Sequence, residues 1–377
     1  MMEERKGLSY FLNYVDYWLL FAVIFLLGIG ILMVYSTTAV QSQEYYGDTV
    51  FMVRKHFIHV LIGMLFCFLA YRINPDKLYQ YSVPILLFSL LLLALTLIPG
   101  IGHVAGGARR WLVLGPIRLQ PGELAKLAAL IYFSSYIQRH KYKMREFKAG
   151  VLVPFVVLAM FASTLLLEPD FGSTVVILVV VFSQIFLYVR PLHIIIVVSS
   201  AIVGLGTLVL MSPYRFKRLV TFSDPFFDAS GSGYQLVQSL IAVGSGGLNG
   251  LGLGNGKQKL FYLPAAHTDF IFAVIAEELG IMGVILVICL FLIILFRGIA
   301  ISRRLISKPY LSSLAIGCTT LMVIPAFLNM GVVSGLLPTK GMVLPLVAYG
   351  GTAMIVHLVA MGILLRLSHF EDDSSWS

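Results

Sequence analysis

The sequence has little charge. Asp, Glu, Lys and Arg make up 12% of its 377 residues, whereas 59% are hydrophobic and the mean hydropathy is +0.92. This composition excludes an ordinary water-soluble domain, and apolar runs repeatedly reach the roughly 20 residues that cross a bilayer core as a helix. The longest polar-leaning segment, residues 212–266, is too short and too rich in glycine to bury its own core. We therefore predict one all-α, polytopic membrane domain over residues 1–377.

Cysteine is also scarce. Cys67, Cys289 and Cys318 all lie in apolar runs, and their spacing excludes a disulfide framework or a zinc site. The charged amino terminus precedes a long apolar run that lacks a signal-peptidase site of the Ala-x-Ala type. The first span is therefore expected to be retained.

Nucleotide-binding motifs are missing despite the glycine-rich segment. Residues 250–254, Gly-Leu-Gly-Leu-Gly, follow no strand–helix–strand pattern, and Gly256-Lys257 lacks the glycine five positions earlier that a P-loop needs. His56 and His59 share a helix face, but no third ligand lies in their segment, so we interpret them as packed or interfacial. Neither a nucleotide nor a nucleic-acid partner is expected.

Ten apolar runs predict ten transmembrane helices with both termini on one side. Short basic loops stay in the cytoplasm, and the strongest such loop is residues 139–148. Both termini are therefore predicted to be cytoplasmic, with the large loop between the seventh and eighth spans, residues 212–266, outside. The predicted spans are 15–36, 56–73, 82–99, 123–138, 149–167, 171–190, 192–211, 270–296, 310–335 and 343–366.

The predicted outer side also carries many cations, which topology alone does not explain. Clustered Arg and Lys beside an apolar wall suit a multiply charged anion at the headgroup level, because guanidinium binds phosphate through paired donors. For any single residue the alternative is contact with lipid phosphates, whereas the set favours a lipid-linked phosphate. The cations are Arg54, Lys55, Arg109, Arg110, Arg118, Arg215, Lys217, Arg218, Lys257, Lys259 and Lys340.

The 212–266 loop is long enough to be a lid or a binding element. Its apolar positions predict a short interfacial helix, and nine glycines between Gly231 and Gly256 permit close backbone approach to a ligand. The apolar positions are Leu236, Val237, Leu240, Ile241 and Val243.

Three carboxylates, Asp269, Glu277 and Glu278, stand at the start of the eighth apolar run, where ionisable groups are costly and a functional site is the default hypothesis. Asp269 lies where an external polar substrate would meet it; alternatively, Thr268 or Asp269 caps the helix. Glu277 is about 12 Å deeper, and Glu278 points about 100° away from it. We predict that both glutamates pair with a cation or hydroxyl of another helix, with Lys126 as the candidate cation.

Two further groups of acids are supporting candidates. Glu123 and Lys126, three residues apart, are predicted to form a helical pair. Glu168-Pro169-Asp170 bends the chain on the outer side, where either carboxylate approaches basic groups or a divalent cation, unless the segment is simply a tight turn.

Ordered motifs along the whole chain closely resemble the SEDS proteins of shape, elongation, division and sporulation. In that family, Pro-Thr-Lys-Gly near the last span looks more like the division branch, FtsW, and its sporulation relatives than the elongation branch, RodA. Ala266, Gly122, Ala348 and Thr352 depart from the usual pattern without touching Asp269. The motifs are residues 107–111, 120–126, 168–172, 213–215, 231–235, 252–254, 267–272, 277–280, 337–341 and 345–351.

The resemblance implies a peptidoglycan glycosyltransferase of the bacterial cytoplasmic membrane. It would polymerise lipid II at the outer face by inverting transfer, with Asp269 as general base. Partners would be lipid II, a class B penicillin-binding transpeptidase, divisome proteins and membrane lipid. No cofactor is required by the sequence, although a divalent cation, Mg²⁺ or Mn²⁺, would suit the diphosphate. The implied substrate-binding residues are Arg109, Arg110, Trp111, Arg215, Arg218, Lys340 and His267.

Three rival functions remain at this stage. A flippase for the same lipid would need charged groups accessible from both membrane faces, whereas the acids and glycines crowd the outer side. A scaffold for division proteins would not explain an acid at a cation-lined lipid boundary. An elongation polymerase of the RodA type would share the chemistry and differ in its cellular role.

Overall fold

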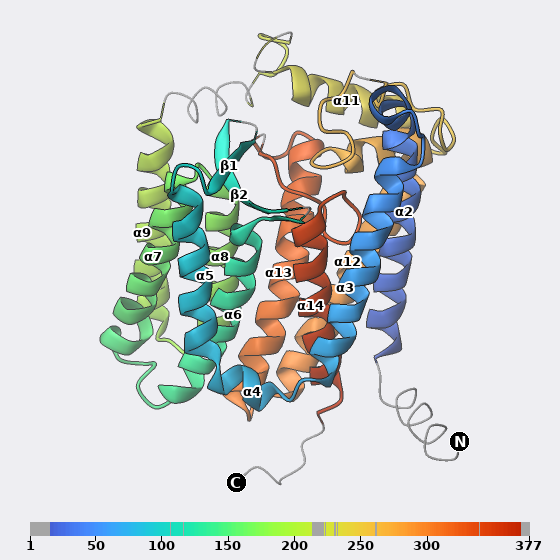
Figure 1. The fold of residues 1–377 in the computed structure, drawn as a ribbon. Coiled ribbons are helices and arrows are strands. Elements are labelled where there is room, and N and C mark those ends of the chain that lie inside the picture. The colour runs from blue at the N-terminus through green and yellow to red at the C-terminus, as the bar shows by residue number, and fades with distance from the viewer. Residues whose placement is uncertain are drawn as a thin grey trace, which may run out of the picture.

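The computed structural model describes residues 16–105, 107–115, 117–212, 222, 224–229, 231, 233–260, 262–338 and 340–370. Ten long helices in these residues overlap the ten predicted spans (Figure 1). They are α2 (Tyr17–Tyr46), α3 (Phe51–Arg72), α5 (Ser82–Leu97), α6 (Pro121–Arg139), α7 (Val153–Leu167, extended by the π-helical turn η1, Lys148–Leu152), α8 (Phe171–Ile185), α9 (Pro191–Leu210), α12 (Ile271–Arg304), α13 (Pro309–Val333) and α14 (Gly351–Ser368). Two short helices, α4 (Pro75–Gln80) and α11 (Tyr234–Gly246), lie between them.

Six helical segments of the described chain are long and apolar enough to cross a membrane. They are α2, α3, the η1–α7 segment, α12, α13 and α14. Shorter apolar helices are Ser82–Leu97, Phe171–Ile185 and Pro191–Gly204. The chain is therefore a mostly helical polytopic membrane protein, and the number of spans stays a prediction.

Three of the predicted span boundaries are wrong, and one of them is the end of α12, which continues to Arg304 rather than residue 296. Helix α2 continues to Tyr46 rather than ending at residue 36, because Thr37 and Thr38 donate their hydroxyls to carbonyls of the preceding turn and do not interrupt the helix. Helix α14 begins at Gly351 rather than residue 343, because Pro345 lacks an N–H and Leu346 has a φ of 63°. The segment before α14 is therefore an irregular loop.

The start of α2 and the end of α14 lie at one end of the helix bundle, which we call the terminal end, and the glycine-rich loop, α11 and a small sheet lie at the other (Figure 1). The basic loop 139–148 lies at the terminal end, as the predicted orientation requires. We call the opposite end the outer end. The described residues thus reproduce the predicted alternation of spans.

The sheet at the outer end corrects the all-helical expectation. Strands β1 (Gly102–Ala105), β2 (Ala108–Leu114) and β3 (Ile117–Leu119) pair antiparallel in the order β1-β2-β3. Gly107 and Gly115 have φ values of 76° and 62°, which suits the two turns. The sheet places the Arg109-Arg110-Trp111 motif on β2, next to the outer ends of α5 and α7.

Two groups of buried apolar residues form the core. One is built mainly by α2, α12, α13 and α14, and the other by α5, α6, α7 and α8. Gln184 of α8 joins them, because its Nε2 donates to Leu130 O at 2.9 Å and Ser134 Oγ at 2.7 Å on α6 and to Ser313 O at 3.1 Å on α13. These contacts satisfy the buried amide nitrogen without introducing charge.

Candidate functional site

Asp269 lies one residue before the N-cap of α12. The N-cap is Phe270, whose side chain makes no capping hydrogen bond, so neither Thr268 nor Asp269 occupies the N-cap position that the alternative required. The backbone of Asp269 is held from another helix, because Asn329 Nδ2 of α13 donates to Asp269 O at 2.7 Å and also to Met342 O at 2.6 Å. One buried amide therefore joins the chain at Asp269 to the loop before α14.

The carboxylate of Asp269 faces that same loop. A Cβ atom placed on Gly341 would lie 2.6 Å from Asp269 Oδ2, so a side chain at this position would displace the carboxylate from where it lies. The neighbouring Lys340 has its Nζ 4.5 Å from the centroid of the Phe171 ring. Residues 340 and 341 thus connect Asp269 to the first residue of α8.

Asp170 caps α8 beside the Lys340 ammonium. Its Oδ1 accepts from Ser173 N at 3.1 Å and its Oδ2 from Ser173 Oγ at 2.7 Å. A Cβ atom on Gly172 would lie 3.2 Å from Asp170 Oδ1 and 3.5 Å from Lys340 Nζ, so both charged groups border Gly172. The prediction that a carboxylate of this turn approaches a basic group is therefore confirmed for Asp170.

Glu168 lies in the same turn but is buried away from the cation. Its Oε1 accepts a hydrogen bond from the Thr96 hydroxyl of α5, and the residue is 1% exposed. Burial raises the pKa of Glu168 to about 7, while the Thr96 hydrogen bond and the Arg110 charge oppose that rise. The Glu168 carboxyl is therefore largely protonated below neutral pH.

The three predicted binding residues on β2 have different surroundings. Arg110 holds the turn, because its Nε donates to Glu168 O at 3.2 Å and its Nη2 to Pro169 O at 2.5 Å. Arg109, on the opposite face of the strand, lines a separate cavity with Leu97 and Pro169. Trp111 is half-buried and pairs with His103 across the sheet. Their role in substrate binding stays a prediction.

Glu123 and Lys126 form the predicted pair, with 2.6 Å between Lys126 Nζ and Glu123 Oε1 and both side chains buried. Lys126 is not the partner of the α12 glutamates, so that prediction is wrong. Glu278 instead binds Lys259 Nζ at 2.6 Å, and both of its oxygens accept from Ser36 Oγ of α2 at 2.8 Å. A cation and a hydroxyl do satisfy Glu278, but the cation comes from the outer loop.

Glu277 binds the outer loop through the backbone. Its Oε1 accepts from Lys257 N at 2.7 Å and from Gln258 N at 3.2 Å, while Glu278 Oε2 accepts from Gly254 N at 3.0 Å. The two glutamates therefore hold residues 254–259 against α12. Lys257 and Lys259, predicted as anion-binding candidates, belong to this support.

A bend in α12 makes this arrangement possible. Gly280 has φ 64° and ψ −162°, which interrupts the helix, and Ile281 N donates to Gly247 O at 3.0 Å. Leu251 N and Gly252 N donate to the carbonyls of Glu277 and Glu278 at 2.9 and 3.0 Å. We call this contact of residues 246–258 with residues 276–281 the glycine seam.

Two glycines of the seam approach α12, and Gly247, Gly250, Gly252 and Gly254 have the positive φ of tight turns, while approach to a ligand stays a prediction. A Cβ atom would lie 1.9 Å from Ala276 O if placed on Gly246, and 2.1 Å from Glu278 O if placed on Gly250. Close backbone packing accounts for both glycines. The predicted short helix is confirmed as α11, which buries Leu236 and Val237 and donates from Ser239 Oγ to Val333 O at 2.8 Å.

Histidines gather around Tyr349 next to Asp269. The Tyr349 N–H donates to His267 O at 2.9 Å, and the Tyr349 ring lies 5.8 Å from the rings of both His267 and His56 and 6.5 Å from that of His59. Burial lowers the pKa of His267, which favours its neutral form. His56 and His59 are packed residues, as predicted. The described residues contain no group of three or more His, Cys, Asp or Glu side chains arranged to hold a metal ion.

Two other features bear on the site. Arg215 and Arg218 lie outside the described residues, so their predicted roles stay predictions.

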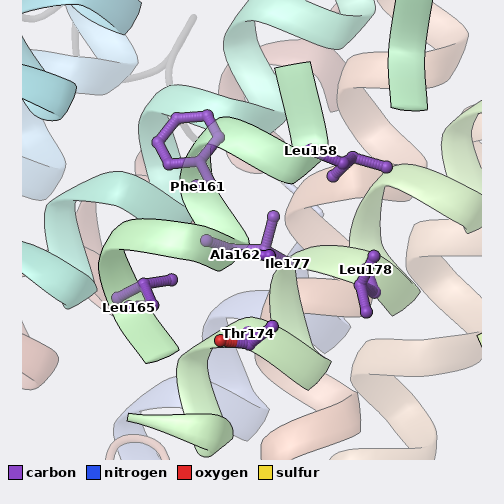
Figure 2. Close-up of a pocket in the computed structure, with 7 residues that line it drawn as sticks. All are labelled: Leu158, Phe161, Ala162, Leu165, Thr174, Ile177 and Leu178. Carbon is purple, nitrogen blue, oxygen red and sulfur yellow. The ribbon is translucent and has the colours of Figure 1, made fainter. Parts of the chain in front are cut away.

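A small hollow between α7 and α8 is lined by apolar side chains and Thr174 (Figure 2), whose hydroxyl donates to Asp170 O. No charged side chain lines this hollow, so it offers nothing to recognise a phosphate.

Sequence reasoning missed Asn329 and Gly341. An asparagine within an apolar span is a detectable signal, because a buried amide needs partners. Gly341 stands in the Pro-Thr-Lys-Gly motif, but its role depends on Asp269, which is distant in sequence. That contact appears only in the folded chain.

Comparison with known proteins accounts for the whole described bundle. The family model described as "Cell cycle protein", for FtsW, RodA and SpoVE, matches residues 17–373. A probable peptidoglycan glycosyltransferase FtsW from Legionella pneumophila is 42% identical over 370 residues, which cover 97% of this chain and 94% of the relative. The protein of the same name from Nitrosococcus halophilus is 43% identical over 355 residues, covering 93% and 92%.

Solved structures show the same fold. A chain from a peptidoglycan synthase complex, described for its coordination of polymerization and crosslinking, is 28% identical with a TM-score of 0.75, covering 94% of this chain and 97% of that one. The rod shape determining protein RodA of Thermus thermophilus is 28% identical with a TM-score of 0.67, covering 94% and 96%. The extent of these matches leaves no part of the membrane domain unaccounted for, and the chain belongs to the FtsW/RodA/SpoVE family.

Proposed function

We propose that the chain is a peptidoglycan glycosyltransferase that polymerises lipid II at the outer face of the bacterial cytoplasmic membrane during cell division. The observation that carries the proposal is the position of Asp269. Its carboxylate faces Gly341, and the residue before that glycine, Lys340, extends to the start of α8. The relatives that match most of the chain are named FtsW, which supports the division role.

Asp269 acts as the general base in this reaction. The 4-hydroxyl of the acceptor sugar attacks C1 of the donor sugar, a C–O bond forms there, and the hydroxyl proton passes to the Asp269 carboxylate. The bond from C1 to the diphosphate oxygen breaks, and its electron pair leaves with the undecaprenyl diphosphate. A single displacement inverts the α-linked donor to a β-linked product. A positioned base contributes about 10²- to 10⁴-fold to such a step.

Lys340 is the proposed stabiliser of the departing diphosphate. A lysine presents a compact charge that suits the negative charge developing on the leaving oxygen. Phe171 and Asp170 border this side chain and limit its positions. A bound Mg²⁺ or Mn²⁺ would supply further positive charge to the same diphosphate.

Polymerisation of purified lipid II tests the base. Asp269→Asn keeps the size of the side chain but removes the proton acceptor, so we expect the turnover rate to fall at least about 100-fold. Asp48→Asn, the same change at a partly exposed outer residue, should leave the rate near that of the wild type. A wild-type rate for a folded Asp269→Asn protein would exclude Asp269 as the base.

A class B penicillin-binding transpeptidase is the proposed partner. The structure of a peptidoglycan synthase complex with the same fold supports this assignment. Adding the cognate transpeptidase to the same assay should increase polymerisation. A flippase would instead move lipid II across the bilayer of a liposome without forming polymer in either condition.

A further inference from the structure

A cavity of about 320 Å³ opens at the outer end between the sheet and the ends of α5 and α7. One side of it is formed by Leu97 at the end of α5, Leu167 at the end of α7 and Pro169 in the turn that follows. Val104 on β1 and Ala108 and Arg109 on β2 form the other. Neither helix packing nor the chemistry proposed for Asp269 uses this space.

Among the residues that the structure describes, Arg109 is the single charged one in the cavity lining. Its Nη1 donates to Leu97 O at 3.3 Å, while its buried Nε has no partner among the described residues. The stem is held over Gly102, where a Cβ atom would lie 2.8 Å from Arg109 Cδ. A fixed guanidinium with an unsatisfied buried donor, and no carboxylate in the lining, favours an anion.

The cavity rim is apolar. Leu167 is 69% exposed and Val104 is 51% exposed, and Ile98 beside them is 45% exposed. These side chains stand where α5 and α7 reach the outer end, so they border the lipid region. An anion that carries a hydrocarbon chain fits both the rim and the guanidinium, whereas free phosphate would use only the guanidinium.

The turn of residues 168–170 separates this cavity from Lys340. Pro169 lines the cavity, whereas Asp170 borders Gly172 and the Lys340 ammonium. Arg110 fixes the turn by donating to the carbonyls of Glu168 and Pro169. Two of the cations at the outer end, Arg109 and Lys340, thus lie on opposite sides of one fixed turn.

We propose that the Arg109 cavity binds the diphosphate of a second lipid-linked sugar. This inference rests on the proposed function, in which two lipid-linked molecules react and each carries a diphosphate. The diphosphate that leaves must be next to the reacting C1 carbon and takes the Lys340 side. In the attacking molecule, the disaccharide separates the reacting hydroxyl from the diphosphate. This second diphosphate therefore needs a separate cationic position. The Arg109 cavity supplies that position.

Binding of undecaprenyl diphosphate to the full chain in phosphatidylcholine nanodiscs tests the inference without turnover. Native mass spectrometry should find two bound molecules on the Asp269→Asn protein and one when Arg109→Gln is added. Arg145→Gln, at an exposed cation of the basic loop, is the charge-matched control and should retain two. Val104→Trp fills the cavity without changing charge and should also leave one, which keeps the test valid if Arg109→Gln fails to fold.

Turnover gives an independent readout. Arg109→Gln should raise the lipid II concentration at half-maximal polymerisation about tenfold, the effect expected for loss of one charge-assisted hydrogen bond, and change the maximal rate less than twofold. Two bound molecules on both cavity variants would overturn the inference. Displacement of the second molecule by phosphatidylglycerol at equal concentration would also overturn it, because the cavity would then be a general site for anionic lipid. An active Asp269→Asn protein would contradict the proposed base and leave the binding result intact.

Discussion

Glu168 and Asp170 show how two carboxyl groups of one turn acquire different properties. Asp170 accepts hydrogen bonds from the backbone and hydroxyl of Ser173 and so caps α8. Glu168 is buried against Thr96, and its Oε2 has no partner among the described residues, which favours its protonated form. The turn therefore contains a carboxylate that caps a helix and an acid that titrates near neutral pH.

The raised pKa of Glu168 predicts a pH dependence of stability. An ordinary glutamate has a pKa of 4.5 and the folded protein holds Glu168 at about 7, so the folded state binds this proton more tightly. The contribution to stability is complete below about pH 4.5 and is lost as the pH rises towards 7. Glu168→Gln keeps a hydrogen-bonding partner for Thr96 without a proton to lose. Relative to the wild type, its stability should rise by about 1 to 3 kcal/mol between pH 5 and pH 8.

Thermal unfolding in detergent at several pH values between 5 and 8 measures this difference. Glu146→Gln, an exposed residue at the terminal end, is the control and should follow the wild type at every pH. If Glu168→Gln also followed the wild type, Glu168 would be charged throughout the range.

Single residues were predictable from the sequence where a charged group stands in an apolar run, because burying that charge costs free energy. Asp269 was identified because an acid at the start of an apolar run needs a reason, and the Glu123–Lys126 pair followed from helical spacing. The partners of Glu277 and Glu278 were not predictable. Glu278 pairs with Lys259 rather than Lys126, and this contact depends on the bend at Gly280. A prediction from helical spacing assumes a straight α12.

At the scale of elements, long helices were predictable and the sheet was not. The long helices have 15 to 34 residues, and each corresponds to an apolar run that can be read directly from the sequence. The strands span only 4, 7 and 3 residues and show no sustained apolar alternation. Their pairing depends on turns at Gly107 and Gly115 and on the ends of α5 and α7. The cavity at Arg109 was therefore outside the reach of the sequence.

The glycine seam predicts a strong effect of a single methyl group. In Gly280→Ala the new Cβ atom would lie 2.3 Å from Gly250 N, in a backbone conformation that residues other than glycine rarely adopt. We expect a loss of at least about 3 kcal/mol in unfolding free energy, since strain and overlap act together. Gly28→Ala in α2 is the matched control, because nothing lies within 4 Å of its Cβ position.

Urea or thermal unfolding of the two variants in the same detergent checks this expectation. Gly28→Ala should match the wild type or exceed it slightly, because alanine favours a helix. Equal stability of the two variants would show that the seam opens without cost.

At the scale of the whole molecule, orientation follows from the distribution of basic loops. Leu248, in the glycine seam, is 71% exposed at the outer end, and Tyr142, in the basic loop, is 88% exposed at the terminal end. Single cysteines at these positions, with Cys67, Cys289 and Cys318 replaced by alanine, report the side of each loop. In intact spheroplasts, a membrane-impermeant maleimide should label Leu248→Cys within minutes and Tyr142→Cys only after permeabilisation. The reverse pattern would invert the predicted topology and place Asp269 in the cytoplasm.

The amide of Asn329 has a consequence for the order in which the chain is synthesised. Hydrogen bonds of the glycine seam join residues between 19 and 34 apart in sequence, such as Gln258 with Glu277 and Gly247 with Ile281, whereas Asn329 follows Asp269 by 60 residues. A ribosome that has released α12 has therefore already supplied both sides of the seam. The chain at Asp269 receives its supporting amide only with the later half of α13, and its facing glycine, Gly341, later still. Support for the outer loop is thus encoded before the site itself is complete.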